Sequence, residues 1–218
     1  MEIKKFNVVE GLYIEKIPCQ DLLAYGIPDN EDFYDVAEAQ EYGGYHGSTI
    51  SFYNLKTGEV YKPFEKERNI LYGRPIYSEG LYYFLQADFN SKLISLFEYF
   101  PEKKLDVVKT FDLNSVHLYN LHLTGNKVHV TSQGEYFRCY YPEVFSFKLE
   151  GNETVSLINE DKVYVEAWIE EGWDEELGCA SENYKYYSKV LVKDFNGNTL
   201  SEEIGQLYQN DDGTWWIS

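Results

Sequence analysis

The sequence predicts an all-β protein, and three observations lead to that prediction. Aromatic residues make up 17% of the 218 residues, with 21 Tyr and 13 Phe, and such side chains are enriched in β-strands. Apolar and aromatic runs alternate with short segments rich in Gly, Asn, Asp and Pro, as antiparallel hairpins require. The clearest stretch, residues 80–113, contains three such runs (81–87, 92–100 and 105–113) separated by two tight turns.

A repeated pattern runs through the rest of the chain. Segments that resemble residues 80–87, each expected to be the second strand of its unit, begin near residues 33, 81, 127, 162 and 214. The intervals are 48, 46, 35 and 52 residues, and intervals in the forties match the length of a four-stranded propeller blade. Apolar third strands are expected after four of these segments, over residues 49–55, 93–99, 144–149 and 190–195.

The two chain ends complete the pattern. Residues 207–218 offer two strands, and residues 4–9 and 12–17 offer two more. Joined in one blade, they would close a ring and remove an exposed sheet edge. The predicted blades cover residues 20–68, 69–114, 115–154 and 155–206, with a fifth made from residues 207–218 and 1–17. Residues 153–159 fit either the end of the third blade or the start of the fourth.

This strand rhythm resembles that of the β-propeller superfamily across the whole chain. The resemblance implies a single domain, a five-bladed β-propeller of four-stranded antiparallel blades with the fifth blade made from both chain ends. No family motif accompanies it, because the chain lacks a Gly-His…Trp-Asp signature, a kelch double glycine and a recurrent metal loop. The alternative architecture is an irregular sandwich or open barrel of similar strands.

Charge and cysteine usage limit the partners and the location. The formal net charge of −18 repels phosphate backbones and anionic lipid surfaces, which disfavours nucleic acids and membranes and favours a basic protein partner. No run approaches the roughly 20 apolar residues of a membrane span, and residues 1–16 lack the apolar segment of a signal peptide. The odd set of Cys19, Cys139 and Cys179 predicts reduced thiols and a cytoplasmic location. The protein is expected to be a monomer.

Three long segments between expected strands carry aromatic residues beside glycines and carboxylates. They cover residues 41–47, 133–142 and 170–187. Flat rings stack on sugars or on cationic side chains, and carboxylates accept hydrogen bonds from hydroxyls and cations. On a propeller these segments would project from one face, so the sequence predicts a binding site there. Its residues are Tyr42, Tyr45, His46, Tyr136, Trp173, Asp174 and Glu175.

The leading interpretation is a non-catalytic binding protein that uses this acidic, aromatic face to contact a protein partner. The alternatives are a carbohydrate-binding propeller and a glycoside-active enzyme. The enzyme would need two carboxylates roughly 5–10 Å apart, and the candidates are Asp35, Asp88, Glu166 and Asp174. The four histidines and three cysteines lack the short spacings of a zinc site, so no metal and no cofactor are expected.

Overall fold

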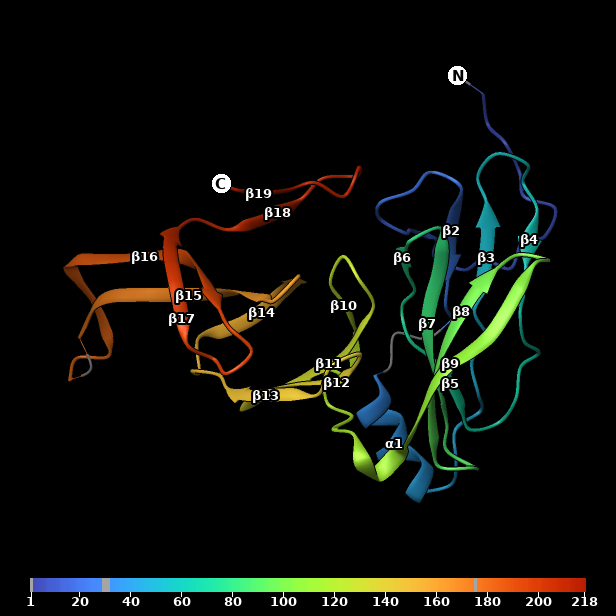
Figure 1. The fold of residues 1–218 in the computed structure, drawn as a ribbon, viewed down its shortest axis with the longest axis horizontal. Helices are drawn as coiled ribbons and strands as arrows, with labels where there is room; N and C mark the ends of the chain where they lie inside the picture. The colour runs from blue at the N-terminus through green and yellow to red at the C-terminus, as the bar shows by residue number, and fades with distance from the viewer. Residues whose placement is uncertain (1, 29–31, 175) are drawn as a thin grey trace. The chain divides into compact units, whose positions relative to one another are not determined.

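The computed structural model describes residues 2–28, 32–174 and 176–218, and it consists mainly of antiparallel β-strands (Figure 1). By its internal contacts the chain divides into two compact units. The first contains residues 1–123 and 130–132, and the second contains residues 124–129 and 133–218. The prediction of an all-β protein is therefore confirmed, and the five-bladed ring stays a prediction.

The strands form several antiparallel sheets. Three sheets have four strands each, in the orders β1-β2-β3-β4, β10-β11-β12-β13 and β14-β15-β16-β17. A fourth sheet has the order β5-β7-β8-β9, with β6 paired to β7, and β18 pairs with β19.

The strand bounds up to residue 112 are β1 (Glu15–Lys16), β2 (Leu23–Gly26), β3 (Ser51–Asn54), β4 (Val60–Tyr61), β5 (Ile70–Tyr72), β6 (Ile76–Ser78), β7 (Leu81–Asp88), β8 (Leu93–Phe100) and β9 (Lys104–Asp112). The later strands are β10 (His122–Thr124), β11 (His129–Gln133), β12 (Tyr136–Tyr141), β13 (Phe145–Lys148), β14 (Glu153–Asn159), β15 (Lys162–Asp174), β16 (Cys179–Lys193), β17 (Thr199–Ile204), β18 (Leu207–Gln209) and β19 (Trp215–Ile217). The helices are α1 (Phe33–Glu41) and the short 3-10 helix η1 (Leu113–Ser115).

An aromatic core holds the first unit together. The ring of Phe52 lies 4.7 Å from that of Tyr99 and 5.9 Å from that of Phe84, measured between centroids. All three side chains are buried. Rings in such tilted and edge-on pairs contribute about 0.5–1.5 kcal/mol each beyond the area that they bury.

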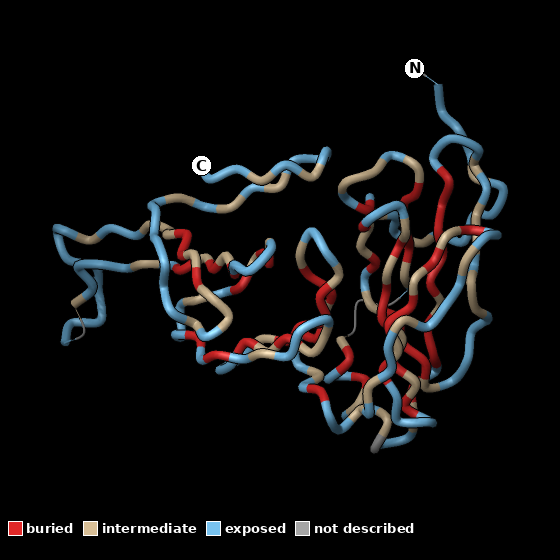
Figure 2. The backbone as a smooth tube through the Cα atoms, in the orientation of Figure 1, coloured by how far each residue is buried: buried red, intermediate tan, exposed pale blue. Residues whose placement is uncertain are grey.

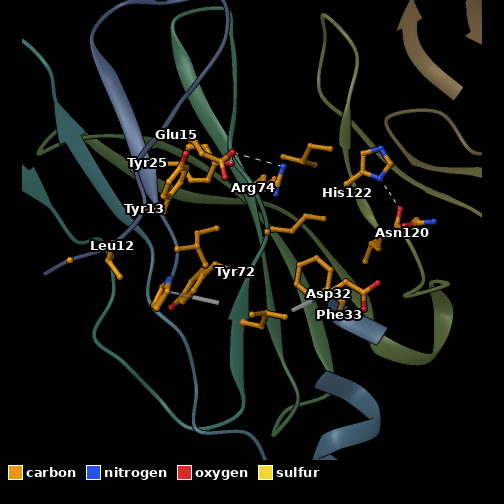
Figure 3. A pocket seen from close by; sticks show the side chains of 18 residues that line it. Leu12, Tyr13, Glu15, Tyr25, Asp32, Phe33, Tyr72, Arg74, Asn120 and His122 are labelled. Atoms are coloured by element: carbon orange, nitrogen blue, oxygen red, sulfur yellow. Dashed lines mark hydrogen bonds and ion pairs between the residues drawn. The ribbon is translucent and has the colours of Figure 1, made fainter. Parts of the chain in front are cut away.

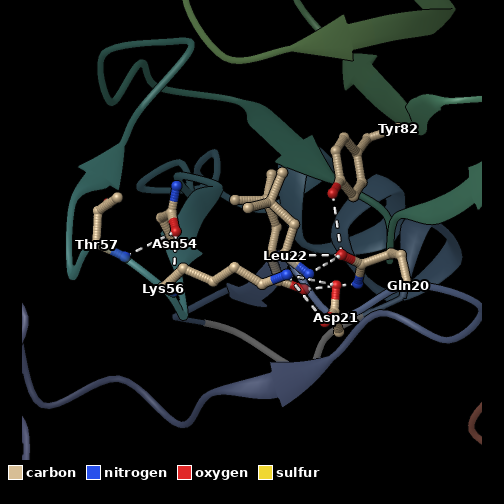
Figure 4. Close-up of polar contacts among 8 residues, drawn as sticks. Gln20, Asp21, Leu22, Asn54, Lys56, Thr57 and Tyr82 are labelled. Atoms are coloured by element: carbon tan, nitrogen blue, oxygen red, sulfur yellow. Dashed lines mark hydrogen bonds and ion pairs between the residues drawn. The ribbon is translucent and has the colours of Figure 1, made fainter.

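Gln20 connects the turn after β1 to the strands around it (Figure 4). Its amide nitrogen donates to the carbonyls of Ile17 and Leu23, at 2.6 and 2.7 Å. Its amide oxygen accepts from the backbone nitrogens of Leu22 and Leu23 and from the hydroxyl of Tyr82, which lies 3.0 Å away on β7. One side chain thus satisfies several backbone groups that a turn leaves without ladder partners.

The strand expected over residues 32–39 is wrong, because this segment forms helix α1. Asp32 caps the helix by accepting a hydrogen bond from the backbone nitrogen of Asp35 at 2.9 Å, the usual role of Asp at this position. Phe33 and Val36, three residues apart, are buried, whereas Tyr34 and Asp35 are exposed. This spacing is that of a helix face, not the alternation of a strand.

The expected strands at the N-terminus are also largely wrong. Residues 4–9 form no strand, and of residues 12–17 only Glu15–Lys16 does, pairing with β2. Asn7 makes an isolated backbone hydrogen bond instead of strand pairing: its nitrogen donates to the carbonyl of Gly58 at 2.9 Å. In the part of the chain that the structure describes, β1 belongs to the sheet of β2, β3 and β4, and β18 and β19 form a sheet of their own, so the closing blade of two strands from each chain end is also wrong.

A buried ion pair connects β14 and β16 in the second unit. The Lys193 ammonium on β16 lies 2.6 and 2.7 Å from the two carboxylate oxygens of Glu153 on β14. Their side chains are only 7% and 5% exposed. Removing one member of such a pair leaves an uncompensated charge in a medium of low polarity, which is strongly unfavourable.

We therefore expect Lys193→Met to lower the free energy of unfolding by about 3–5 kcal/mol. Adding Glu153→Leu should recover much of that loss, because neither charge is then buried alone. Lys189→Met is the matched control, since its ion pair with Glu202 is more exposed to solvent and should contribute little. Urea denaturation of the unaltered protein, Lys193→Met, the double variant and Lys189→Met measures these free energies of unfolding. An equal loss of stability in Lys193→Met and Lys189→Met would contradict the prediction.

Candidate functional site

The predicted site residues of the first unit differ in exposure. Tyr42 follows the last residue of α1 and is 89% exposed, and His46 is also exposed. Tyr45 is buried, and its backbone nitrogen donates to the Asn69 side chain at 2.7 Å. Tyr45 is therefore part of the packing of this segment, while Tyr42 and His46 reach solvent.

Tyr136 lies on a strand and not in a loop, so the expected loop over residues 133–142 is wrong. These residues mostly form β12, which pairs with β13 in a register that sets Tyr136 opposite Lys148. Phe137 and Cys139 are buried, and Tyr136 and Arg138 are not. The guanidinium of Arg138 lies 5.3 Å from the centre of the Tyr136 ring, so the chain's own cation already covers this ring.

The expected loop over residues 170–187 is also mostly strand. The pairing of β15 with β16 continues from Val163 opposite Lys193 to Asp174 opposite Cys179. The tip of this hairpin is exposed, whereas its base at Val163 and Lys193 is buried (Figure 2). Trp173 and Asp174 lie near the tip on β15, and Glu175 lies outside the described residues. The grouping of all seven predicted residues on one face stays a prediction.

Four aromatic rings form a continuous row along the exposed part of this hairpin. The ring centroids of Trp168 and Tyr186 are 6.2 Å apart, those of Tyr186 and Tyr184 6.3 Å, and those of Tyr184 and Trp173 6.1 Å. Trp168 is 50% exposed, Trp173 47% and Tyr186 66%. We call these rings together with Glu170 the hairpin surface. Large exposed apolar groups that lie side by side are a common sign of a binding surface.

A carboxylate on each face of the hairpin binds the tyrosine side chains beside it. The Tyr184 hydroxyl donates to Glu170 at 2.6 Å, and this hydrogen bond raises the pKa of Tyr184. Glu171, the next residue, accepts from Tyr187 at 2.8 Å and pairs with Lys185 at 2.8 Å. The bond from Lys185, followed by that from Tyr187, lowers the pKa of Glu171. Glu171 therefore stays ionised at neutral pH.

Gly172 lets the strand bend before Trp173. The register shifts between Glu171 and Trp173, and Gly172 has a φ of +76°. A Cβ atom there would lie 2.8 Å from the backbone oxygen of Asn183. Bulges of this kind redirect the side chains that follow them, and Trp173 is the next side chain.

The turn after Trp173 is held by Asp174. Its carboxylate accepts hydrogen bonds from the backbone nitrogens of Glu176 and Leu177, at 3.0 and 2.9 Å. Asp174 is thus a turn residue first, as Asp often is.

The candidate catalytic carboxylates also have structural partners. Glu166 accepts from the backbone nitrogen of Leu207 at 2.9 Å, and Asp88 accepts from that of Asn90 at 2.9 Å. Asp35 is exposed on α1. Glu166 and Asp174 are eight residues apart on β15, which corresponds to about 26 Å along a strand. A glycosidase needs its two carboxylates within roughly 5–10 Å, so these two do not form such a pair.

Trp168, Tyr184 and Tyr186 were missed as site residues, although the sequence holds a signal for them. Tyr184 and Tyr186 are two residues apart, as are Trp168 and Glu170, so each pair lies on one face of a strand. Recognition of residues 179–187 as a strand would have brought the two pairs together.

The structure offers little support for metal or thiol chemistry. In residues 2–28, 32–174 and 176–218, no three His, Cys, Asp or Glu side chains are grouped so that they could hold a metal ion. Burial raises the pKa of the Cys139 thiol to about 11, which keeps it protonated and poorly nucleophilic. Neither helix of the described chain has the length and apolar character that a bilayer crossing requires.

Comparisons of the chain with protein-family models, with curated proteins and with solved structures give no match.

Gly172→Ala tests how the bulge positions Trp173. We expect the substitution to disorder the hairpin tip, because φ is positive there and the new Cβ meets backbone. Trp173 should lose its packing on Tyr184, visible as a red shift of tryptophan fluorescence, while the thermal midpoint falls by only a few degrees. Gly178→Ala is the control, since a Cβ there has open space at a similarly positive φ. An equal response of both variants would show that strain at φ alone, and not the contact with Asn183, is responsible.

Proposed function

We propose that this chain is a non-catalytic binding protein whose hairpin surface takes a basic segment of a protein partner. The observation that carries the proposal is the row of four rings on the β15–β16 hairpin, three of them exposed, with Glu170 beside it. Aromatic rings without cations of their own, set beside carboxylates, fit the side chains of Arg and Lys.

Charge supports a basic partner over a neutral one. Residues 166–188 contain seven carboxylic side chains and one lysine, and the whole chain has a net charge of −18. Such a field accelerates the encounter with a cationic partner and repels an anionic one. On the opposite face of the hairpin the Lys185 ammonium lies 5.7 Å from the centre of the Tyr187 ring, an example within this chain of the contact that a partner's lysine would make.

The same rings also favour a second candidate, a carbohydrate. Exposed tryptophan and tyrosine faces stack on sugar rings, and carboxylates such as Glu170 accept hydrogen bonds from hydroxyls. A neutral sugar gains nothing from the net charge, so the two candidates differ in their response to salt.

We further propose that the four-stranded antiparallel sheets are blades of a five-bladed propeller, and that the protein is a cytoplasmic monomer. Three sheets of four strands support the first part. The odd number of cysteines supports a reducing compartment.

The binding proposal is tested with a decapeptide of alternating Arg and Gly, its Glu and Gly counterpart, and cellohexaose. We expect calorimetry to show binding of the arginine peptide alone, with an affinity that falls steeply between about 50 and 300 mM NaCl because salt screens surface charges. The fluorescence of the exposed tryptophans should change on binding. Salt-insensitive binding of cellohexaose would favour the carbohydrate candidate. If neither the arginine peptide nor cellohexaose binds, the proposal of a binding site on the hairpin surface is contradicted.

Substitutions locate the site. Trp173→Ala should weaken peptide binding by about tenfold or more and leave the thermal midpoint nearly unchanged, since this ring is half exposed. Glu170→Gln should also weaken peptide binding, although the oxygen of the new amide can still accept the hydrogen bond from the Tyr184 hydroxyl. Trp216→Ala is the matched control, because Trp216 is a similarly exposed tryptophan on another hairpin of the same unit. An equal effect of Trp216→Ala would rule out the hairpin surface as the site.

A further inference from the structure

The first unit contains a cavity of about 440 Å³ that the proposed function does not use. It lies between the residues before β1, strands β2, β5 and β7, the start of α1 and residues 120–123 (Figure 3). Sites for small molecules commonly have volumes of roughly 300–1,000 Å³. The cavity is therefore large enough for a ligand.

The inner wall of this cavity is apolar and rigid. Leu71, Leu85, Phe33 and Tyr72 line it, and all four belong to the buried part of the unit. Since these side chains are held by packing on their other sides, they form a preorganised surface for an apolar body.

The polar groups of the cavity are mainly hydrogen-bond acceptors. Glu15 and Asp32 each bring a carboxylate. One oxygen of Asp32 caps α1, which leaves the second oxygen for another donor. Glu15 accepts from the Tyr25 hydroxyl at 2.7 Å, and a carboxylate oxygen can accept more than one hydrogen bond.

His122 adds a further acceptor. Its Nδ1 lies 2.7 Å from the backbone oxygen of Asn120, so Nδ1 carries the hydrogen and Nε2 carries the lone pair. Burial lowers the pKa of His122, which keeps the ring neutral at pH 7. In Figure 3, His122 and Asp32 lie on one side of the cavity, with Tyr13, Tyr25 and Tyr72 on the other.

Arg74 is the one cationic side chain among the residues described as lining the cavity. Its side chain is 71% exposed, and its nearest carboxylate oxygen, on Glu15, is 3.9 Å away, beyond hydrogen-bonding distance. Arg74 therefore stands at the opening and only partly offsets Glu15. Two carboxylates against one guanidinium leave the lining with a net negative charge, in a chain whose charge of −18 attracts cations.

We propose that this cavity binds a small organic amine. The apolar body of the ligand would lie against Leu71, Leu85 and Phe33, and its ammonium group would donate to the carboxylate of Asp32. The carboxylate of Glu15, on the other side of the cavity, would add a second negative charge that attracts the ammonium. The tyrosine rings at the opposite wall add the attraction of aromatic faces for a cation.

The probes for this site are 2-phenylethylamine and hexylamine, compared with 3-phenylpropionate and 2-phenylethanol. The last two are close in shape to the first probe but carry a negative charge or none. We expect calorimetry at pH 7 to show binding of at least one amine, with the acid and the alcohol at least about tenfold weaker, since a charge-assisted hydrogen bond is lost. Tighter binding of the acid, or the absence of binding by both amines at millimolar concentration, would overturn the proposal.

Three charge-neutralising variants locate the amine. Asp32→Asn keeps a side chain that caps helices as well as Asp does, and Glu15→Gln keeps an acceptor for the Tyr25 hydroxyl. Each should weaken amine binding by about tenfold. Asp35→Asn removes the same charge from the same helical turn, outside the cavity, and should leave binding unchanged. If Asp35→Asn weakens binding as much as the other two, only the net charge matters and the cavity is not the site.

The cavity and the hairpin surface are tested independently. Trp173→Ala should leave amine binding unchanged, and Asp32→Asn should leave binding of the arginine peptide unchanged. Loss of both activities in either variant would show that the variant disturbs folding, and Glu15→Gln then provides the separate test of the cavity.

Discussion

The antiparallel pairing of β15 with β16 is the constraint on which the second unit depends. These are its longest strands, and their register runs from Val163 opposite Lys193 to Asp174 opposite Cys179. Because side chains alternate between the two faces of a strand, one pairing sets both ends of the hairpin. At one end Val163 and Val165 enter the core with Leu191, and at the other the same alternation presents Trp168 and Glu170 to solvent.

The exposed end of the hairpin remains ordered without a core because its side chains support one another. The four rings of the hairpin surface contact each other in sequence, and Tyr184 donates to Glu170. Tyr187 and Lys185 bind Glu171 on the other face. Such cross-strand pairs stabilise a hairpin, and the charges discourage pairing with another sheet edge. An exposed and preorganised row of rings is well suited to binding, since little entropy is lost when a partner docks.

The two binding sites proposed for this chain share one chemical preference. The hairpin surface and the cavity differ in shape, one an open row of rings and the other a hollow with an inner wall that includes Leu71 and Leu85. Both combine aromatic rings with carboxylates, so the proposed ligands of both carry a positive charge and apolar surface. The excess of carboxylates over basic residues throughout the chain strengthens that preference at both sites.

Local signals in the sequence were enough to predict the strands whose turns and alternation are both clear. Strands β7 and β8 lie where residues 81–87 and 93–99 predict them, because alternating apolar residues and a tight turn encode a hairpin without help from distant residues. Much of the candidate surface could also have been found this way, since Tyr184 and Tyr186 show the alternation of a strand.

Other features were decided by the tertiary structure. Residues 33–41 form a helix because Phe33 and Val36 are buried on one side of it, and a segment this short depends on packing more than on propensity. Tyr45 and Tyr42 are the same residue type three positions apart, yet one is buried and the other exposed. The acceptors of the cavity come from positions 15, 32 and 122, which are far apart in the chain.

The sequence by itself determined the β-class, the acidic charge and the aromatic content, because these depend on composition and local pattern. Which rings face solvent and which carboxylates meet depended on long-range strand pairing, because no local pattern specifies a strand's distant partner.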